Sequence, residues 1–381
     1  MKILVVAHYQ GDGSPTAIFI HDQMKAFVEA GHEVMVISPV GMGKKDFHGS
    51  RLLPMIRKEM IDGIKHVYLR YLTISRFGNR YFNHASAIAM LKLHYRTVLD
   101  GFRPDVIHAH TLGFNSEIGA WLKNQLGLPL VVTTHGSDTT VLVNRGELDD
   151  LRVLCSKADV VVAVSNALEN RLRLCGTQTE IRTIHNGYND EGLAGHTEKE
   201  PYSFLQVSNL IELKQIPVTI RAFEKIYRQY PQSRLTIIGR GPDREMLEKL
   251  CDDLQISEAV TFTGQLQHHE VIAHMAKTQF YVMPSVREGL PISYLEAMGM
   301  RCVVVGTATE GIAEIISNGV NGFLVQPGDF DAIAQYVNMC FEDPAKALYI
   351  STEGEKTAKN LTWRANAQCY EALFRKLSEG E

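Results

Sequence analysis

Two glutamates and one lysine are the side chains of this sequence best suited to hold a ligand that carries both hydroxyls and phosphate. Glu288 and Glu296 stand eight residues apart on either side of a glycine turn. Carboxylates accept hydrogen bonds from hydroxyls, so each glutamate is a candidate grip for a sugar. Lys214 follows an apolar run and offers a point charge for a diphosphate. On pattern alone, the alternative is that Glu288 is a first-turn acid, while Glu296 and Lys214 are solvated surface residues.

The segment around the glutamates is typical of a strand end, a turn and a helix start. Residues 280–283 are apolar and short enough for a buried strand, and Gly289 loosens the turn. Pro291 suits the first helical position, where its missing N–H has no consequence. The free amides of residues 292–294 would then face an anion at the positive end of the helix dipole.

Two more glycine turns follow expected strands in the second half, at Gly239-Arg-Gly-Pro and at Gly264-Gln265-Leu266. Glycine lets the backbone approach a ligand closely, so the second turn could present backbone groups to a base. Each turn by itself is weak evidence.

A glycine loop also follows the first expected strand. Gly11 and Gly13 have the spacing of a dinucleotide fingerprint, but Thr16 stands where the third glycine belongs. No acidic residue ends the second strand, so the ribose anchor of dinucleotide enzymes is missing. We expect amides that meet an acceptor phosphate or the donor's pyrophosphate, and a plain tight turn is the alternative.

Three histidines lie at or just beyond strand ends of the first half. His108 and His110 share one strand face and His135 follows the next strand, so a metal site is one hypothesis. We favour a polar cleft lining, because the carboxylates that usually orient metal-bound histidines are not evident. Gly136 permits close approach of a ligand, and Asp138 is placed to orient the imidazole or to bond a hydroxyl.

Composition is that of a soluble globular protein with two domains. The 381 residues exceed what one core usually serves, and no apolar run suits a signal peptide or a membrane span. The six cysteines are scattered without metal or disulfide spacing, so we expect reduced packing residues and a cytoplasmic location.

The net charge of −4 hides a basic region in the first half. Residues 44–103 hold twelve basic residues against four acidic ones, with aromatics interleaved. Such a surface could lie on an anionic membrane at its inner face or receive a phosphorylated acceptor, and a solvated face is the alternative. Nucleic acid is not expected, because the whole chain is acidic and carries no recognised motif.

Strand-like runs alternate with helical stretches, which predicts parallel sheets covered by helices on both faces. We expect domains at 1–185 and 186–361, joined by the polar stretch 186–201, with a last helix at about 362–381 crossing back. The expected strands are 2–7, 32–38, 106–108, 130–134, 160–164, 181–184, 204–208, 235–239, 260–263, 280–283, 302–305 and 322–325. The expected helices of the first half are 16–30, 85–99, 116–126, 148–156 and 166–174.

Taken together, these residues resemble the retaining family-4 glycosyltransferases, also called glycosyl transferases group 1. The resemblance covers nearly the whole chain, and its most specific part is Pro-Ser-x-x-Glu-Gly…Leu-Glu-Ala-Met around Glu288 and Glu296. It implies the α/β GT-B fold, in which two Rossmann-like, doubly wound domains face each other across a deep cleft.

The resemblance also implies roles for single residues. Glu296 would hold the ribose hydroxyls, Glu288 would contact the donor sugar, and Lys214 with the amides after Gly289 would bind the diphosphate. His135 would hydrogen-bond the transferred sugar from the opposite domain. The implied donor-binding set is Asn209, Gly239, Gly264, Gln265, Leu266, Gly289, Leu290, Pro291, Ile292 and Glu296.

Three positions depart from the family pattern. Asn209 stands where many relatives carry an arginine, so Lys214 would carry more of the charge neutralisation. Leu290-Pro291 replaces a more usual Phe-Gly and should stiffen the turn. Glu310-Gly311 stands where the family usually has two glycines before a helix, so only one glycine remains. This leaves open how closely the backbone approaches the sugar there.

The expected activity is transfer of a sugar from a nucleoside diphosphate sugar, with UDP-sugar favoured, to a hydroxyl acceptor with retention. A lipid-linked or polysaccharide precursor of the cell envelope is the expected acceptor, and no cofactor or metal is expected. Two alternatives remain open: an epimerase of the same architecture, and a catalytically silent partner that binds a nucleotide sugar.

Overall fold

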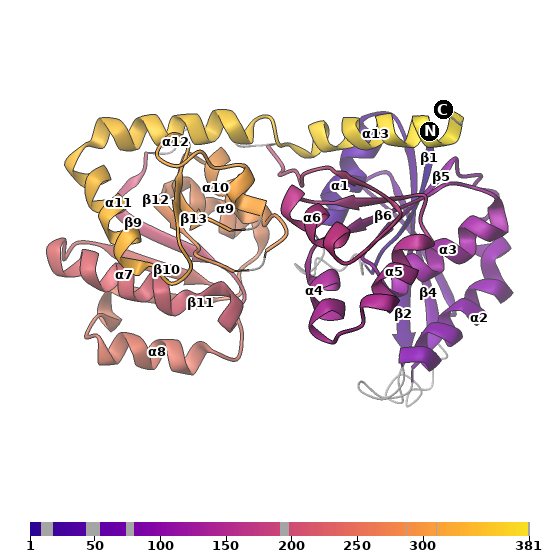
Figure 1. Ribbon diagram of the computed structural model, residues 1–381, viewed down its shortest axis with the longest axis horizontal. Coiled ribbons are helices and arrows are strands. Elements are labelled where there is room, and N and C mark those ends of the chain that lie inside the picture. The colour runs from indigo at the N-terminus through magenta and orange to yellow at the C-terminus, as the bar shows by residue number, and fades with distance from the viewer. Residues whose placement is uncertain are drawn as a thin grey trace. The chain divides into compact units, whose positions relative to one another are not determined.

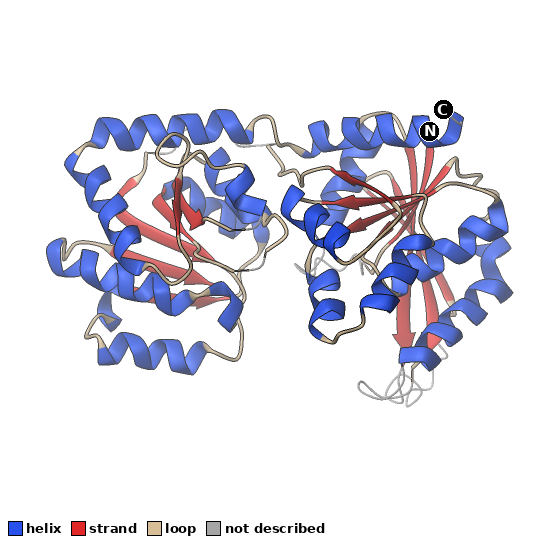
Figure 2. Cartoon of the chain, viewed as in Figure 1, coloured by secondary structure: helices blue, strands red, loops and turns tan. Residues whose placement is uncertain are grey.

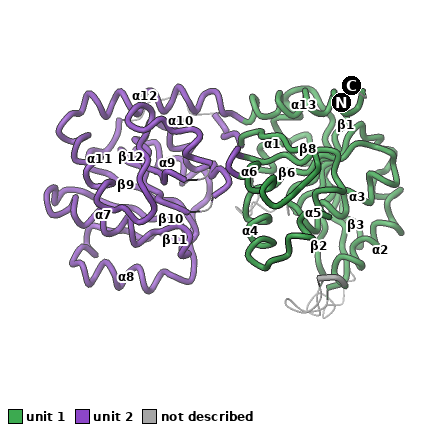
Figure 3. Tube along the Cα trace, viewed as in Figure 1, with its two compact units in different colours: residues 1–164, 168–185, 363–381 green, residues 165–167, 186–362 purple. Residues whose placement is uncertain are grey.

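The chain forms two compact units in a computed structural model that describes residues 1–8, 18–42, 54–73, 80–190, 198–286, 288–309 and 311–379. Unit 1 comprises Met1–Val164, Leu168–His185 and Trp363–Glu381, and unit 2 comprises Ser165–Ala167 and Asn186–Thr362 (Figure 3). Each unit has its own sheet with helices packed around it (Figure 2).

Unit 1 is built on an eight-stranded sheet in the order β3-β4-β2-β1-β5-β6-β7-β8. All neighbouring pairs are parallel except β3 with β4. The strands are β1 (Lys2–Val6), β2 (Glu33–Met42), β3 (Ile56–Ile61), β4 (Ile64–Leu72), β5 (Val106–His110), β6 (Leu130–Thr134), β7 (Val160–Ala163) and β8 (Glu180–Thr183).

The β3–β4 hairpin corrects the expectation of purely parallel sheets. Its turn is Asp62-Gly63, and both residues have positive φ angles of 49° and 77°. Asp-Gly is a strong signal for a two-residue hairpin turn, so the sequence did carry this information. The charged, half-exposed residues of β3 hid the strand, because they lack the apolar pattern of a buried one.

The helices of unit 1 agree with the sequence expectations except for α4, which was missed. They are α1 (Ile18–Glu29), α2 (Arg80–Leu99), α3 (Phe114–Leu126), α4 (Ser137–Asn144), α5 (Leu148–Ser156), α6 (Asn166–Leu174) and α13 (Trp363–Glu379). The two ends of the chain meet here, because α13 packs beside α1 (Figure 1). Tyr370 and Phe374 of α13 contact the ring of Phe27 of α1.

Unit 2 has a six-stranded, fully parallel sheet in the order β11-β10-β9-β12-β13-β14. Its strands are β9 (Glu200–Val207), β10 (Arg234–Ile238), β11 (Val260–Gly264), β12 (Thr278–Val282), β13 (Val303–Thr307) and β14 (Phe323–Val325). Its helices are α7 (Ile216–Gln229), α8 (Arg244–Asp253), α9 (His268–Lys277), α10 (Ile292–Gly299), α11 (Phe330–Glu342) and α12 (Pro344–Ala358), with short 3-10 turns η3 (Glu212–Lys214), η4 (Ser257–Ala259) and η5 (Gly311–Glu314).

Local sequence explains where the helices of unit 2 begin. Asp329 and Asp343 cap α11 and α12 by accepting hydrogen bonds from the amides of Ala332 and Lys346. The strand β13 reads Val-Val-Val-Gly-Thr and is buried along its whole length, as expected for a central parallel strand.

None of the helices in the described part of the chain combines the length and the apolar character that a membrane span requires.

The turn at Gly239 allows two strand-end loops of unit 2 to touch through their backbones. Gly239 has φ +144°, and a Cβ atom there would lie 1.8 Å from the carbonyl oxygen of Ser208. The close approach places the turn after β10 directly against the turn after β9. Only glycine fits without moving the backbone.

Replacing Gly239 with alanine should therefore lower the free energy of unfolding by about 3 kcal/mol or more, through backbone strain and overlap. Gly319→Ala is the matched control, because Gly319 also has positive φ (+77°) but no atom lies within 4 Å of its added Cβ. The control should lose only about 1 kcal/mol. Chemical denaturation followed by circular dichroism compares the two, and equal losses would contradict the close packing.

Candidate functional site

The carboxyl ends of the neighbouring strands β9 and β12 bring Lys214 and Glu288 together in unit 2. The Lys214 ammonium and the Glu288 carboxylate form an ion pair, and their side chains are 17% and 22% exposed. The two loops are also joined through the backbone, where the amide of Val286 donates to the carbonyl of Leu213 at 3.0 Å. The sequence prediction gave the two groups separate ligand partners, whereas here each is the other's partner.

Gln206 is a supporting residue that sequence reasoning missed. It lies in β9, is fully buried, and donates from Nε2 to the backbone carbonyl of Lys214 at 3.1 Å. This bond fixes the turn that carries the lysine. A glutamine between the apolar residues Leu205 and Val207 was the available signal, because buried amides need specific partners.

The start of α10 differs in detail from the prediction. Pro291 is the N-cap, with an extended backbone, rather than the first helical residue. The amide of Tyr294 donates to the carbonyl of Pro291 at 3.3 Å, so it is not free for an anion as expected. The Tyr281 hydroxyl donates to Ser293 Oγ at 2.8 Å, which ties the first turn to β12. Burial raises the pKa of Tyr281, so this hydroxyl stays protonated.

The turn from Glu288 to Pro291 is clamped from two sides. Asn186 donates from Nδ2 to the carbonyl of Leu290 at 2.9 Å, and both residues are buried. Gly311 packs on Gly289 so closely that a Cβ atom on Gly311 would lie 1.8 Å from the Gly289 carbonyl oxygen. The backbone at Gly311 is therefore packed against the Glu288–Pro291 turn, while Glu310 lies outside the described residues.

Glu296, the second glutamate, lies in α10 and is only 7% exposed. Its carboxylate oxygen Oε1 is 2.6 Å from Nε2 of His268, the first residue of α9. The alternative of a solvated helix residue is therefore wrong for Glu296. His268 did not emerge from the sequence, because nothing in the chain order links it to residue 296.

The remaining donor-side residues follow the ends of β9, β10 and β11, next to each other in the sheet. The amide of Gly239 donates to the carbonyl of Gly264 at 2.9 Å, so these two turns support each other. Asn209 and Gln265 are exposed and Leu266 is half-buried. Their backbone and side-chain groups lie at the edge where parallel sheets bind ligands.

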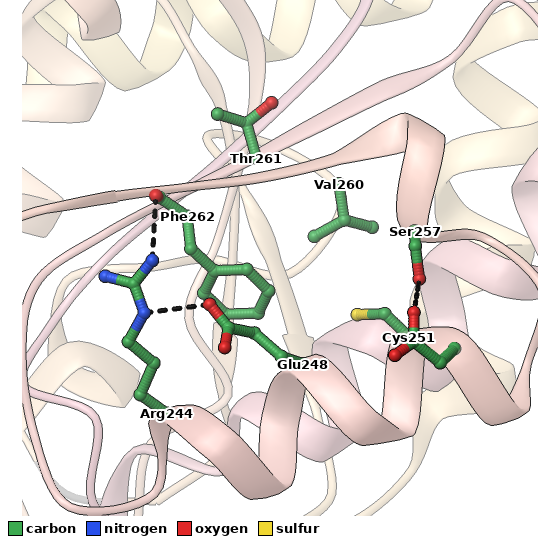
Figure 4. A pocket seen from close by; sticks show the side chains of 8 residues that line it. Arg244, Glu248, Cys251, Ser257, Val260, Thr261 and Phe262 are labelled. Carbon is green, nitrogen blue, oxygen red and sulfur yellow. Dashed lines mark hydrogen bonds and ion pairs between the residues drawn. The ribbon is translucent and has the colours of Figure 1, made fainter.

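A separate hollow of about 350 Å³ lies between α8 and β11 (Figure 4). Its charged groups bond one another: Arg244 contacts Glu248 at 2.8 Å and the carbonyl of Phe262 at 3.4 Å, and Ser257 bonds Asp252. These pairings leave the hollow without the convergent polar groups that mark a ligand site.

In unit 1 the three predicted histidines do lie together. The rings of His110 and His135 stack at 5.4 Å, and Nδ1 of His110 lies 3.2 Å from Nε2 of His135. His108 Nε2 is 2.8 Å from the Thr133 hydroxyl, which in turn lies 2.6 Å from the hydroxyl of Tyr370. Among the described residues, no group of three His, Cys, Asp or Glu side chains is arranged to hold a metal ion.

Asp138 binds the backbone around it. Its carboxylate accepts hydrogen bonds from the amides of Leu112, His135 and Gly136 at 2.7, 3.2 and 3.1 Å, and from the Thr134 hydroxyl at 2.8 Å. It thus orients His135 through the main chain rather than through the imidazole. The loop glycines Gly11 and Gly13 lie outside the residues that the structure describes.

Burial keeps the histidine cluster neutral. It lowers the pKa of His108 to about 3 and that of His110 well below its usual value, and it also lowers the pKa of His135. A neutral imidazole offers one donor and one acceptor nitrogen. His135 is therefore suited to hydrogen bonding and not to binding an anion by charge.

Two family models match the chain over complementary parts. The model for Glycosyltransferase Family 4 matches residues 16–191, and the model for Glycosyl transferases group 1 matches residues 194–357. One curated relative is the GDP-mannose-dependent alpha-(1-6)-phosphatidylinositol monomannoside mannosyltransferase of Mycolicibacterium smegmatis. It is 29% identical over 255 residues, which cover 62% of this chain and 67% of that protein.

Solved structures show the same architecture. Sucrose-phosphate synthase from Thermosynechococcus elongatus superposes with a TM-score of 0.79 at 20% identity, over 100% of both chains. Anabaena HepE in complex with UDP-glucose superposes with a TM-score of 0.73 at 19% identity, over 99% of this chain and 100% of that one. The fold predicted from the sequence, GT-B, is confirmed.

The neutral histidines make stability fall in acid. Below pH 6.5 the unfolded chain protonates these side chains, whereas folded His108 stays neutral down to about pH 3. The unfolded state then binds more protons, so the free energy of unfolding should drop as pH falls from 6.5 towards 3, by about 2 kcal/mol at pH 5 for this residue.

Denaturant titrations at pH 7, 6 and 5 test this with His108→Gln, which should lose part of the acid slope. His8→Gln, at an exposed position of the same unit, should keep the whole slope. An unchanged slope in His108→Gln would contradict the assignment.

Proposed function

The chain belongs to the glycosyltransferases of group 1 and family 4, and on that premise we propose that it transfers a sugar from a nucleoside diphosphate sugar to a hydroxyl acceptor with retention at the anomeric carbon. The observation that carries this proposal is the Lys214–Glu288 ion pair at the strand ends of unit 2, with the buried carboxylate of Glu296 in the helix that follows. Glycosyltransferase activity follows from the family. The donor, the acceptor and the stereochemistry are the proposal.

The Lys214–Glu288 pair gives the donor a place to enter by exchange. A diphosphate oxygen replaces the Glu288 carboxylate as the partner of the Lys214 ammonium. The released carboxylate then accepts hydrogen bonds from hydroxyls of the donor sugar. Neither charge is then left buried without a partner, which would be strongly unfavourable. The pair thus holds both groups in place before the donor binds.

Catalysis in this proposal is mainly electrostatic. As the bond between the anomeric carbon and the phosphate oxygen breaks, Lys214 and the amides at the start of α10 stabilise the growing negative charge. The acceptor oxygen bonds to the same face of the anomeric carbon, and the departing phosphate takes the acceptor proton. Glu288 is then a sugar ligand and not a covalent nucleophile, and the chain needs no metal ion. The contact of His135 with the transferred sugar stays a prediction from the resemblance.

We propose a UDP-sugar as the donor and a lipid-linked or polysaccharide precursor as the acceptor. HepE binds UDP-glucose, which supports the first, and the mannosyltransferase relative acts on a phosphatidylinositol mannoside, which supports the second. That relative is GDP-mannose-dependent, so activity should be measured with a GDP-sugar as well as with a UDP-sugar.

The basic residues of the 44–103 region that the structure describes include Arg57 and Lys58. Arg57 pairs with Glu59, and Lys58 pairs with Asp100.

Lys214→Ala should reduce turnover by about 10²- to 10³-fold, because it removes charge stabilisation of the leaving group. Stability should fall far less than turnover, although Glu288 loses its partner. Lys249→Ala, an exposed lysine on α8, is the matched control and should retain full activity. The measurement is release of nucleoside diphosphate in the presence of donor and acceptor. Near-normal turnover of Lys214→Ala would sink the assignment.

The stereochemistry is tested on the product, and the metal requirement is tested by measuring activity in the presence of a chelator. Proton NMR of the freshly formed glycoside should show the anomeric configuration of the donor, and activity should persist in excess EDTA. An inverted product, or loss of activity that added Mg²⁺ restores, would overturn the corresponding part of the proposal. Conversion of the nucleotide sugar without any acceptor would indicate an epimerase instead.

A further inference from the structure

The contact between His268 and Glu296 joins two helices at the donor side of unit 2. Glu296 Oε1 and His268 Nε2 are 2.6 Å apart, the Glu296 side chain is 9% exposed and the His268 side chain is 30% exposed. The carboxylate is therefore almost removed from water, while one edge of the imidazole is not. A buried carboxylate needs hydrogen-bond donors to offset its lost hydration, and the imidazole N–H supplies one.

Both partners are held by their own helices. His268 is the first residue of α9, where Gln267 and Glu270 form a capping box, with the Gln267 amide donating to Glu270 at 2.8 Å. Glu296 lies in the middle of α10, between the fully buried Leu295 and Ala297. The contact therefore fixes the orientation of the Glu296 carboxylate on a rigid frame, which is the arrangement expected around a binding group.

We propose that His268 is a positioning residue that sets the Glu296 carboxylate for the 2′- and 3′-hydroxyls of the donor ribose. This rests on the proposed function, in which Glu296 is the ribose ligand. Two neighbouring hydroxyls donate to one carboxylate only when both of its oxygens face them. Free rotation of the carboxylate would turn the oxygens away from the hydroxyls. His268 holds Oε1 from one side, which leaves Oε2 and the second lone pair of Oε1 for the hydroxyls.

A purely structural role for the contact has different consequences. If His268 only joined α9 to α10, its loss would lower stability and weaken every ligand equally. A positioning role instead affects the ribose hydroxyls selectively. The preference for a ribonucleotide over its 2′-deoxy and 3′-deoxy forms therefore separates the two roles.

The experiment is isothermal titration calorimetry of the full chain with UDP and GDP and with their 2′-deoxy and 3′-deoxy forms. The wild-type protein should prefer the ribonucleotide by about tenfold or more, as expected for a hydrogen bond to a charged group. His268→Ala should lose most of that preference, and His268→Gln should recover part of it, because the glutamine amide can still donate to Glu296. His269→Ala, the exposed neighbour on the same helix, should behave like wild type.

The outcomes distinguish this inference from the function on which it rests. If His268→Ala kept the full preference for ribose, or if His268→Gln and His268→Ala were equally impaired, the positioning role would be overturned while donor binding stood. If the wild type bound UDP or GDP without any ribose preference, both the grip of Glu296 and the role of His268 would fall. If neither nucleotide bound at all, the proposed function would fall with them.

Discussion

Parallel pairing of β9 with β12 is the constraint on which the Lys214–Glu288 site of unit 2 depends. Phe204 pairs with Phe280 and Leu205 with Tyr281, so the two strands end at the same edge of the sheet. The loops that leave them are therefore neighbours although 74 positions separate Lys214 from Glu288. A lysine and a glutamate that look unrelated in the sequence become an ion pair because the strands run in the same direction.

Close backbone packing then fixes these loops in a way that side chains alone could not. The Gly239 turn rests on Ser208, and Gly311 rests on Gly289, in both cases without room for a Cβ atom. Gln206 and Asn186 add side-chain amides that bond the carbonyls of Lys214 and Leu290. The loops at this edge are thus supported by close main-chain contacts and by two buried side-chain amides.

The sequence predicted the elements that repeat a simple pattern and missed those that depend on distant partners. Apolar runs such as those of β7 and β13 predicted buried parallel strands, and glycine turns indicated where strands end. The hairpin strands β3 and β4 were both missed because charged residues interrupt their apolar pattern, and α4 was missed because Ser137–Asn144 is short. The glutamates and Lys214 were identified from local context, but their pairing was not, because it depends on strand order. His268 and Gln206 act through side-chain bonds to Glu296 and to the carbonyl of Lys214, and no periodicity reveals such bonds.

The placement of α13 in unit 1 makes that unit discontinuous in the sequence. Tyr370 packs against Phe27 and His108, and its hydroxyl bonds Thr133, so the core around α1, β5 and β6 includes residues from the last part of the chain. During synthesis on the ribosome, residues 1–185 emerge long before these contacts can form, whereas all of unit 2 emerges before α13. Unit 1 therefore begins to form before unit 2 and is completed after it, and the apolar face that α13 covers stays exposed until α13 has been made.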